Sequence, residues 1–310
     1  MDGCWIGIDV AKDRLDVHVL PSGERLAVAR DGEGIAGLVE RLQPLQPACI
    51  AVEATGGFQR VVAAGLAGAG LPVVVVNPAQ IRHFAKALGK RAKTDAIDAE
   101  VIARFVEATK PEIRPLPDQD TRLLAALVAR RRQIITMIIA EQNRRRFITN
   151  PRLVRSIERL VKALEKELAV LDGDLDTAVR ASPIWRERED LLISVPGVGP
   201  RIARTLLAEL PELGTLDRRR IASLVGLAPH PRQSGTWRGK SFIGGGRASV
   251  RTALFMAAMV AGRYNPAMRA FKQRLLDAGK PKMVALIATA RKLLTILNAI
   301  VRTRQPWQAA

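Results

Sequence analysis

Short apolar runs alternate with turn residues and helical segments in the first third of the chain, and this alternation constrains the fold more than any other feature. Residues 5–9, 15–20 and 25–29 follow one another with turns between them, which predicts a three-stranded antiparallel meander. Residues 49–53 and 71–76 predict two further buried strands, and a helical segment follows each of them. Strands first and strand–helix units afterwards are typical of a mixed α/β layer with an antiparallel edge.

A proline-rich segment, residues 111–117, separates this α/β part from the remainder of the chain. Gly and Pro are almost absent from the two stretches that follow, within residues 118–181, and Leu and Ile recur there every three or four residues. This spacing predicts two long helices and suggests an antiparallel coiled coil. We therefore expect an α/β domain at residues 1–117, a helical coiled-coil region at 118–181 and a mostly helical domain at 182–310.

The chain has a large excess of positive charge, with 49 Lys and Arg against 30 Asp and Glu and a formal net charge of +19. Such an excess indicates a nucleic-acid partner, because each contact between a cation and a phosphate releases condensed counterions. Two arginine triplets on the first long helix have only Glu141 near them in the sequence, which favours phosphate contact over a solvated helix face. The six residues are Arg130, Arg131, Arg132, Arg144, Arg145 and Arg146.

The composition disfavours several other classes of protein. Two cysteines, Cys4 and Cys49, allow neither a disulfide framework nor a zinc cluster and are expected to be small buried residues. No signal peptide is indicated, and apolar stretches such as residues 253–261 are too short to span a bilayer, so we expect a cytoplasmic protein without a membrane partner. Tyr264 is the only tyrosine, which disfavours a tyrosine recombinase.

Four acidic residues stand out by their positions in the predicted elements. Asp9 and Glu53 each end an apolar strand, and the ends of strands in an α/β sheet can converge on one site. Asp95 and Asp98 are three residues apart near the start of a helix, so they share one of its faces. Clustered carboxylates repel one another unless a cation neutralises them, and their oxygen atoms suit Mg²⁺ or Mn²⁺. Together the four residues predict a metal site that acts on phosphates.

A structural role is the alternative for each acid taken alone. The helix macrodipole by itself would explain either Asp95 or Asp98, because it favours acidic residues in the first turn. Asp13 and Asp16 are the nearest competitors for a metal-binding role. We interpret them as turn and surface residues, because they lie beyond the strand end or within the meander.

Residues 195–200, Val-Pro-Gly-Val-Gly-Pro, form a tight turn between two predicted helices. The turn resembles that of a helix-hairpin-helix, in which backbone amides of glycines at a helix N-terminus contact a phosphate. An ordinary turn between helices fits the sequence equally well. Phosphate contact by Gly197 and Gly199 is therefore one of two open interpretations.

Motifs in both halves of the chain resemble those of one family of insertion-sequence transposases. That family has an N-terminal RuvC-like domain with four acidic residues and a C-terminal transposase domain with a catalytic serine, and it includes bridge-RNA-guided recombinases and pilin-gene invertases. The motifs appear in the expected order along nearly the whole chain. They are I-G-I-D-V-A-K at residues 6–12, V-E-A-T-G-G at 52–57, V-N-P at 76–78, K-T-D-A-I-D-A at 93–99, V-P-G-V-G-P at 195–200, L-V-G-L-A-P at 224–229, Q-S-G at 233–235 and V-R-T-A-L at 250–254.

The resemblance implies an RNase H-like (RuvC-like) fold for the N-terminal domain, with Asp9, Glu53, Asp95 and Asp98 as metal ligands. It also implies that Ser234, in the Q-S-G motif, attacks the DNA backbone and forms a covalent phosphoserine link. In the family, the serine of one protomer meets the carboxylates of another within a tetramer, and a noncoding RNA pairs with donor and target DNA. The implied partners are therefore DNA, a structured guide RNA and further copies of the chain, as a dimer to a tetramer.

The residues around Ser234 are compatible with such chemistry. A serine hydroxyl is a weak nucleophile that needs a base or a metal for activation, and His230 is the only histidine nearby. Gly235 allows close approach of a backbone. Without the resemblance, Ser234 would be interpreted as a polar loop residue, and Ser241 and Ser249 are rival serines. The basic residues that could neutralise a phosphate in the transition state are Arg232, Arg238, Lys240 and Arg247.

DNA transposition by strand cleavage and exchange is the main functional hypothesis. A site-specific DNA invertase with the same chemistry is the nearest alternative, and a structure-specific RuvC-like nuclease would cut DNA without Ser234. A protein that only packages nucleic acid would explain the charge but not the four acids. The sequence leaves open the choice between transposase and invertase, the target DNA and the role of the glycine-rich loop at residues 244–246.

Overall fold

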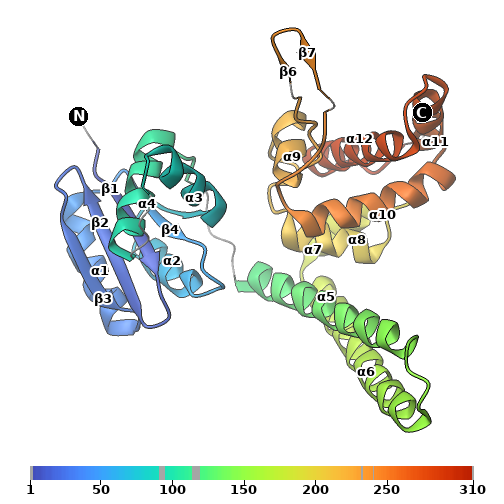
Figure 1. The fold of residues 1–310 in the computed structure, drawn as a ribbon, viewed down its shortest axis with the longest axis horizontal. Coiled ribbons are helices and arrows are strands. Elements are labelled where there is room, and N and C mark those ends of the chain that lie inside the picture. The colour runs from blue at the N-terminus through green and yellow to red at the C-terminus, as the bar shows by residue number, and fades with distance from the viewer. Residues whose placement is uncertain (1–2, 91–94, 114–118, 232, 240, 309–310) are drawn as a thin grey trace. The chain divides into compact units, whose positions relative to one another are not determined.

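The computed structural model describes residues 3–90, 95–113, 119–231, 233–239 and 241–308. The chain divides into two compact units, Met1–Leu116 and Pro117–Ala310 (Figure 1). Each unit has its own hydrophobic core, and each is described separately below.

A five-stranded mixed sheet forms the centre of the first unit, with the strand order β3-β2-β1-β4-β5. β1 pairs antiparallel with β2 and parallel with β4, and β5 is parallel to β4. The predicted meander and the parallel strands after it are confirmed, so the unit is a mixed α/β layer with an antiparallel edge. The strands are β1 (Trp5–Val10), β2 (Arg14–Leu20), β3 (Arg25–Ala29), β4 (Cys49–Glu53) and β5 (Val73–Val76).

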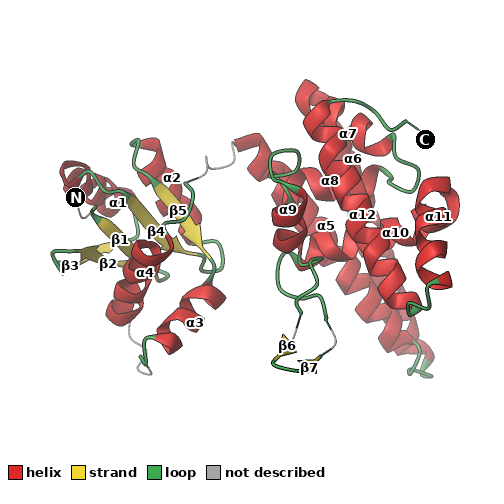
Figure 2. Ribbon diagram, turned by 90° about the horizontal axis from the view of Figure 1, so that it is seen from above, coloured by secondary structure: helices red, strands yellow, loops and turns green. Residues whose placement is uncertain are grey.

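Helices cover both faces of this sheet (Figure 1; Figure 2). They are α1 (Gly32–Leu42), α2 (Gln59–Gly68), α3 (Pro78–Ala87) and α4 (Asp95–Thr109). α1 and α2 pack on the face that carries Ile6 and Ile8, whereas α3 and α4 pack on the face that carries Trp5 and Ala51. Because side chains alternate along a strand, Asp9 lies on the same face of β1 as Trp5, the face that α4 covers.

α4 lies directly against β1 because Gly7 has no side chain. A Cβ atom on Gly7 would come within 2.2 Å of the Ala99 carbonyl oxygen and within 2.4 Å of the Ala103 amide nitrogen. Ala99 and Ala103 are themselves buried, so small residues on both elements allow the two backbones to touch. The glycine between Ile6 and Ile8 is therefore a packing requirement of this sheet.

Glu100 ties α4 to the sheet and to the segment before the helix. Its carboxylate, 12% exposed, accepts hydrogen bonds from Lys90 at 2.7 Å, from Arg104 at 2.9 Å and from Arg25 of β3 at 3.2 Å. The hydrogen bond from Lys90 is the main cause that lowers the pKa of Glu100, while burial acts in the opposite direction. The carboxylate therefore remains ionised in the folded chain and holds α4 in place.

Helices make up nearly all of the second unit. α5 (Gln119–Arg145) and α6 (Pro151–Ala181) form an antiparallel pair around Ile134, Ile138 and Leu171, which confirms the two predicted long helices (Figure 1). The helices that follow are α7 (Pro183–Ile193), α8 (Pro200–Glu209), α9 (Arg218–Val225), α10 (Ala248–Tyr264), α11 (Pro266–Asp277) and α12 (Lys282–Thr303).

α12 is a central helix of this second core. Leu293, Leu294 and Leu297 are fully buried, and the helix contacts α7, α9, α10 and α11. The helix is long and apolar enough to cross a membrane, but 50% of its most apolar stretch is buried inside the unit. Such burial is what a core helix of a helical domain shows.

Four of the described helices begin with a polar capping residue, Asn or Ser, that is followed by a proline. The side-chain oxygen of the capping residue accepts a hydrogen bond from an amide of the first turn, and proline suits the first helical position because it needs no amide partner. The capping residues are Asn77, Asn150, Ser182 and Asn265. The last of them starts α11, a helix that the spacing of apolar residues did not predict.

Replacement of Gly7 by alanine is expected to push α4 away from β1 and to lower the free energy of unfolding by about 1–3 kcal/mol, as overpacking of a core does. Gly37→Ala is the matched control. Gly37 is exposed on α1 with open space around its Cβ position, so alanine there should raise the free energy of unfolding by up to about 1 kcal/mol. Urea unfolding followed by circular dichroism measures both, and equal effects would contradict the packing role of Gly7.

Glu100→Gln is expected to lower the free energy of unfolding by about 1–3 kcal/mol at neutral pH. The pKa of Glu100 in the folded chain is below its ordinary value of 4.5, so its charge stabilises the fold above that pH and ceases to do so as the pH falls through the folded pKa. The difference between parent and variant should therefore shrink below pH 4.5 in urea unfolding at a series of pH values. The control, Glu24→Gln, breaks an exposed pair with Arg41 and should cost less than about 1 kcal/mol.

Candidate active site

Asp9 and Glu53 lie at the carboxyl ends of two adjacent parallel strands. In the parallel register of β1 and β4 the last paired residues are Ile8 and Val52, and Asp9 and Glu53 come directly after them. Both side chains are half-buried, and both project to the face that α4 covers, because Gly7 on the same face touches that helix. The register therefore places these two acids at adjacent strand ends, and their convergence on one metal site stays a prediction.

α4 brings further acidic residues to this face of the sheet. The helix begins at Asp95, and Asp98 directly precedes Ala99, whose carbonyl faces Gly7. Asp98 is half-buried, whereas the side chain of Asp95 lies outside the described residues. Within the described side chains, no group of three or more His, Cys, Asp or Glu is placed to hold a metal ion, so the four-ligand site stays a prediction.

Asp16 is a further acid on this face, and the prediction that it is a surface residue is wrong. Asp16 is only 4% exposed, and it lies opposite Asp9 in the antiparallel register of β1 and β2. Arg14 donates a hydrogen bond to its Oδ1 at 2.6 Å, whereas its buried Oδ2 has no hydrogen-bond partner among the described residues. Its place within the meander led to the prediction of a surface position, but α4 covers this face of β2.

The side chains near Asp9 fit a hard divalent cation. Carboxylate oxygens are ligands that Mg²⁺ and Mn²⁺ prefer, and a buried polar atom such as Oδ2 of Asp16 ordinarily has a partner. His18, two residues along the same face of β2, is also buried, and its Nδ1 has no partner in the described part of the chain. Burial lowers the pKa of His18, so its ring stays neutral and adds no positive charge to the site.

Ser234 lies in the second unit, in a short β-hairpin. β6 (Gln233–Ser234) pairs antiparallel with β7 (Trp237–Arg238), with Ser234 opposite Trp237 (Figure 2). Gly235 takes a positive φ of 55° in the turn between them, a conformation that glycine adopts without strain. Ser234 and Trp237 are both exposed, so the serine hydroxyl is accessible to a large substrate.

The glycine-rich loop, whose role the sequence left open, anchors this hairpin to the rest of the unit. The backbones of His230 and Phe242 pair in an antiparallel bridge that joins the two arms of the hairpin at its base. Gly246 then packs on the end of α9, where a Cβ atom would lie 2.5 Å from the Gly226 amide nitrogen and 2.6 Å from the Leu224 carbonyl oxygen. Ser234 is thus carried on an exposed hairpin whose base is firmly packed.

Ion pairs engage most of the α5 arginines that the sequence assigned to phosphate contact. Arg131 pairs with Asp172 of α6 at 2.5 Å, and Arg132 pairs with Glu209 of α8 at 2.6 Å. Two further pairs are Arg144 with Glu141 and Arg145 with Glu158. Most of these partners are far from the arginines in the sequence. The net positive charge of the helix is therefore smaller than the arginine triplets alone indicate. The other two arginines of the triplets are exposed.

Packing accounts for some of the other residues predicted to bind phosphate. Gly197 has a φ of 104°, and a Cβ atom there would lie 2.6 Å from the backbone of Ala261. Gly199 begins α8 with open space around it. Arg247 donates a hydrogen bond to Glu212 at 2.6 Å and so helps to anchor the glycine-rich loop. The side chains that lie outside the described residues are those of Arg232, Arg238 and Lys240.

Family models match both halves of the chain. A transposase model named for DEDD residues and IS110 elements matches residues 6–148, and the model of the IS116/IS110/IS902 family of transposases matches residues 189–273. The pilin gene-inverting protein of Moraxella bovis is 30% identical in an alignment of 320 positions that spans 99% of this chain and 98% of that protein. The chain belongs to the IS116/IS110/IS902 transposase family. The resemblance that the motifs predicted is therefore confirmed.

Other members of this transposase family match to different extents. The IS116 uncharacterized 44.8 kDa protein of Streptomyces clavuligerus is 25% identical over 98% of this chain and 96% of that protein. The IS110 uncharacterized 43.6 kDa protein of Streptomyces coelicolor is 30% identical over 48% of this chain and 36% of that protein. Membership makes this transposase or invertase a DNA recombination enzyme that binds DNA, and the DEDD designation points to a divalent metal.

Gly246→Ala is expected to lower the free energy of unfolding by about 1–3 kcal/mol, because the φ of 62° and the nearby backbone both exclude a side chain. Gly173→Ala, in α6 with open space around its Cβ position, is the control and should raise the free energy of unfolding by up to about 1 kcal/mol. Thermal unfolding with hydrogen exchange measures both. If the Arg247 amide, which bonds to Leu224, kept its full protection in Gly246→Ala, the anchoring role would be wrong.

Proposed function

We propose that this transposase cleaves and rejoins DNA strands with a metal site formed by Asp9, Glu53, Asp95 and Asp98 and with Ser234 as the nucleophile. The placement of Asp9 and Glu53 at adjacent strand ends, on the face that α4 covers, carries this proposal. The strand order and the single antiparallel edge support an RNase H-like (RuvC-like) fold. In this proposal the catalytic acids belong to residues 1–117, the coiled coil to 118–181 and the serine to 182–310.

Mg²⁺ or Mn²⁺ is the cofactor that we propose for the four carboxylates. The bound cation would neutralise the acids and polarise the oxygens of the scissile phosphate. Asp9 and Glu53 would hold it from the sheet, and Asp95 and Asp98 from α4. Asp16 supports the fit, because its buried Oδ2 lies on the residue opposite Asp9 and lacks another partner in the described part of the chain.

Ser234 would perform the covalent step. Its Oγ forms a bond to phosphorus while the bond from phosphorus to the leaving strand breaks, and the serine proton ends on the leaving oxygen. A hydroxyl group of the exchanged strand then attacks the phosphoserine, regenerates the serine and forms a new phosphodiester. One phosphodiester is broken and one is made, so strand exchange needs no external source of energy. The exposed hairpin position supports access of the hydroxyl to a DNA backbone.

The four acids belong to the first unit and Ser234 to the second. We propose, on the basis of the family resemblance, that Ser234 of one protomer acts with the carboxylates of another in a dimer or tetramer. On the same basis, a structured noncoding RNA would guide the enzyme to donor and target DNA. The net charge of +19 supports both polyanionic partners. The reaction would take place in the bacterial cytoplasm, at the nucleoid, where the DNA substrate lies.

A site-specific DNA invertase is the second candidate. The 30% identity to the pilin gene-inverting protein, over 99% of this chain, favours it. Inversion and transposition share the same chemistry and differ in the arrangement of the recombined sites. Plasmids that carry the sites in inverted orientation, or on separate molecules, distinguish the two activities by their products.

Ser234→Ala should abolish the covalent link between protein and DNA, and Asp9→Ala should reduce strand cleavage by more than about 1,000-fold. Labelled DNA on denaturing gels measures both, and calorimetry with Mn²⁺ should show weaker binding by Asp9→Ala regardless of activity. Ser241→Ala is the matched control, because Ser241 is an exposed serine of the same loop and should keep the parental activity. Full recombination by Ser234→Ala would contradict the covalent role, and cleavage without a covalent link would indicate a nuclease.

Mixed protomers extend this experiment to the shared site. A mixture of Asp9→Ala and Ser234→Ala chains contains protomers with intact serines and others with intact carboxylates. Recombination should return to part of the parental level if the serine and the acids act from different chains. Failure of every mixture to recombine, with mixed oligomers shown to form, would mean that each chain uses its own serine and acids.

A further inference from the structure

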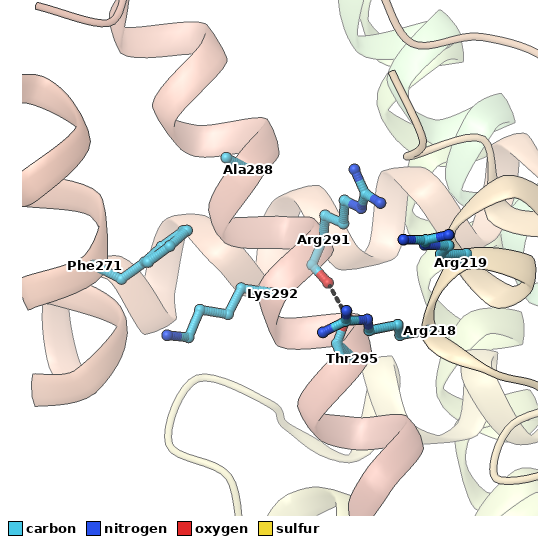
Figure 3. Close-up of a pocket in the computed structure, with 7 residues that line it drawn as sticks. All are labelled: Arg218, Arg219, Phe271, Ala288, Arg291, Lys292 and Thr295. Carbon is cyan, nitrogen blue, oxygen red and sulfur yellow. Dashed lines mark hydrogen bonds between the residues drawn. The ribbon is translucent and has the colours of Figure 1, made fainter. Parts of the chain in front are cut away.

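A basic pocket lies between α9, α11 and α12 of the second unit (Figure 3). Its volume is about 450 Å³. The residues that line it are Arg218 and Arg219 of α9, Phe271 of α11, and Ala288, Arg291, Lys292 and Thr295 of α12. None of them belongs to the Ser234 hairpin or to the four acids, and none was assigned to a function from the sequence.

The four cations of the basic pocket form no ion pairs with described residues, although Asp217, at the start of α9, attracts Arg219 electrostatically. Arg218, Arg219, Arg291 and Lys292 make no ion pair among the described residues, and no acid lines the pocket. The adjacent Asp217 caps α9 instead, accepting hydrogen bonds from the first amides of the helix, and it pairs with another arginine. Like charges held together repel one another, so the pocket favours an anionic ligand.

The arrangement of the pocket differs from that of the two arginine triplets at residues 130–132 and 144–146. There, four of six guanidinium groups pair with carboxylates of the same chain. In the basic pocket, Arg219 and Arg291 extend from two helices into the space between them (Figure 3). The positive end of the α9 macrodipole, where Arg218 and Arg219 lie, adds to the attraction of an anion.

The aromatic ring and the hydroxyl group of the pocket already have partners within the chain. The Phe271 ring already contacts two cations, with the Lys292 ammonium 4.5 Å and the Arg274 guanidinium 5.4 Å from its centroid. The Thr295 hydroxyl donates a hydrogen bond to the Arg291 carbonyl at 3.0 Å. Single-stranded nucleic acid and RNA are commonly recognised by base stacking on aromatic rings and by contacts to 2′-hydroxyl groups. These features favour the phosphates of duplex DNA, which need only cations.

We propose that the basic pocket binds backbone phosphates of duplex DNA and does so independently of base sequence. The inference rests on the proposed function, because it assumes a DNA substrate, and it assigns a contact that lies outside the catalytic groups. Such a site positions a duplex by charge and leaves recognition of its sequence to other contacts. Salt-sensitive affinity that is equal for unrelated sequences is the signature of this mode of binding.

The test uses Arg219→Gln/Arg291→Gln, which removes one cation from each of two helices of the pocket. Fluorescence anisotropy on two duplexes of unrelated sequence should show an affinity loss of about tenfold or more on both. The slope of log affinity against log salt concentration should decrease by about 1–2, near 0.9 for each lost phosphate contact. Arg219→Lys/Arg291→Lys keeps both charges and should retain most of the affinity.

Arg302→Gln/Arg304→Gln is the matched control, because it removes two exposed charges near the end of α12, away from the residues that line the pocket. It should weaken binding by less than about threefold, and circular dichroism should show that all variants are folded. Equal losses in the two Gln variants, a loss on one duplex only, or a loss confined to RNA would overturn the inference. If the parent failed to bind duplex DNA, the proposed function would fail, whereas undiminished binding by the pocket variant overturns the pocket alone.

Discussion

The first unit depends on the contact between Gly7 and the backbone of α4. The helix approaches the strand this closely because Gly7, Ala99 and Ala103 are all small. The same contact places the first turns of α4 on the sheet face that carries Asp9. Glu100 adds three hydrogen bonds that hold the helix there. Packing and the proposed metal site are therefore linked, because the residues that bring the layers together also bring acidic residues of the sheet and of the helix to one face.

The fold of the first unit could largely be predicted from the sequence, because apolar runs and turn residues mark its strands. β4 was predicted at its observed bounds, Cys49–Glu53. The burial of Asp16 was not predicted, because its position in the meander does not show that a helix covers that face of the sheet. The β6–β7 hairpin was not predicted either, because strands of two residues are too short to form a pattern.

The candidate site was predictable where it depends on strand ends and less so where it depends on contacts between distant segments. Asp9 and Glu53 follow from the rule that parallel strands end at one edge, whereas the role of Ser234 rests on family resemblance. The pairing of Arg131 with Asp172 could not be found by counting charges along one helix. The basic pocket could not be predicted from the sequence for the same reason, because its cations come from α9 and α12, which are far apart in the sequence.

The joint between Gly226 and Gly246 separates two parts of the second unit that face different demands. The joint itself admits no side chain, because each glycine lies against the backbone of the other segment. Beyond it, the hairpin that carries Ser234 is exposed. Its length and composition can therefore change without cost to the helical core. Substitutions in the hairpin away from Ser234 therefore alter its own contacts and leave the packing of the helical core in place.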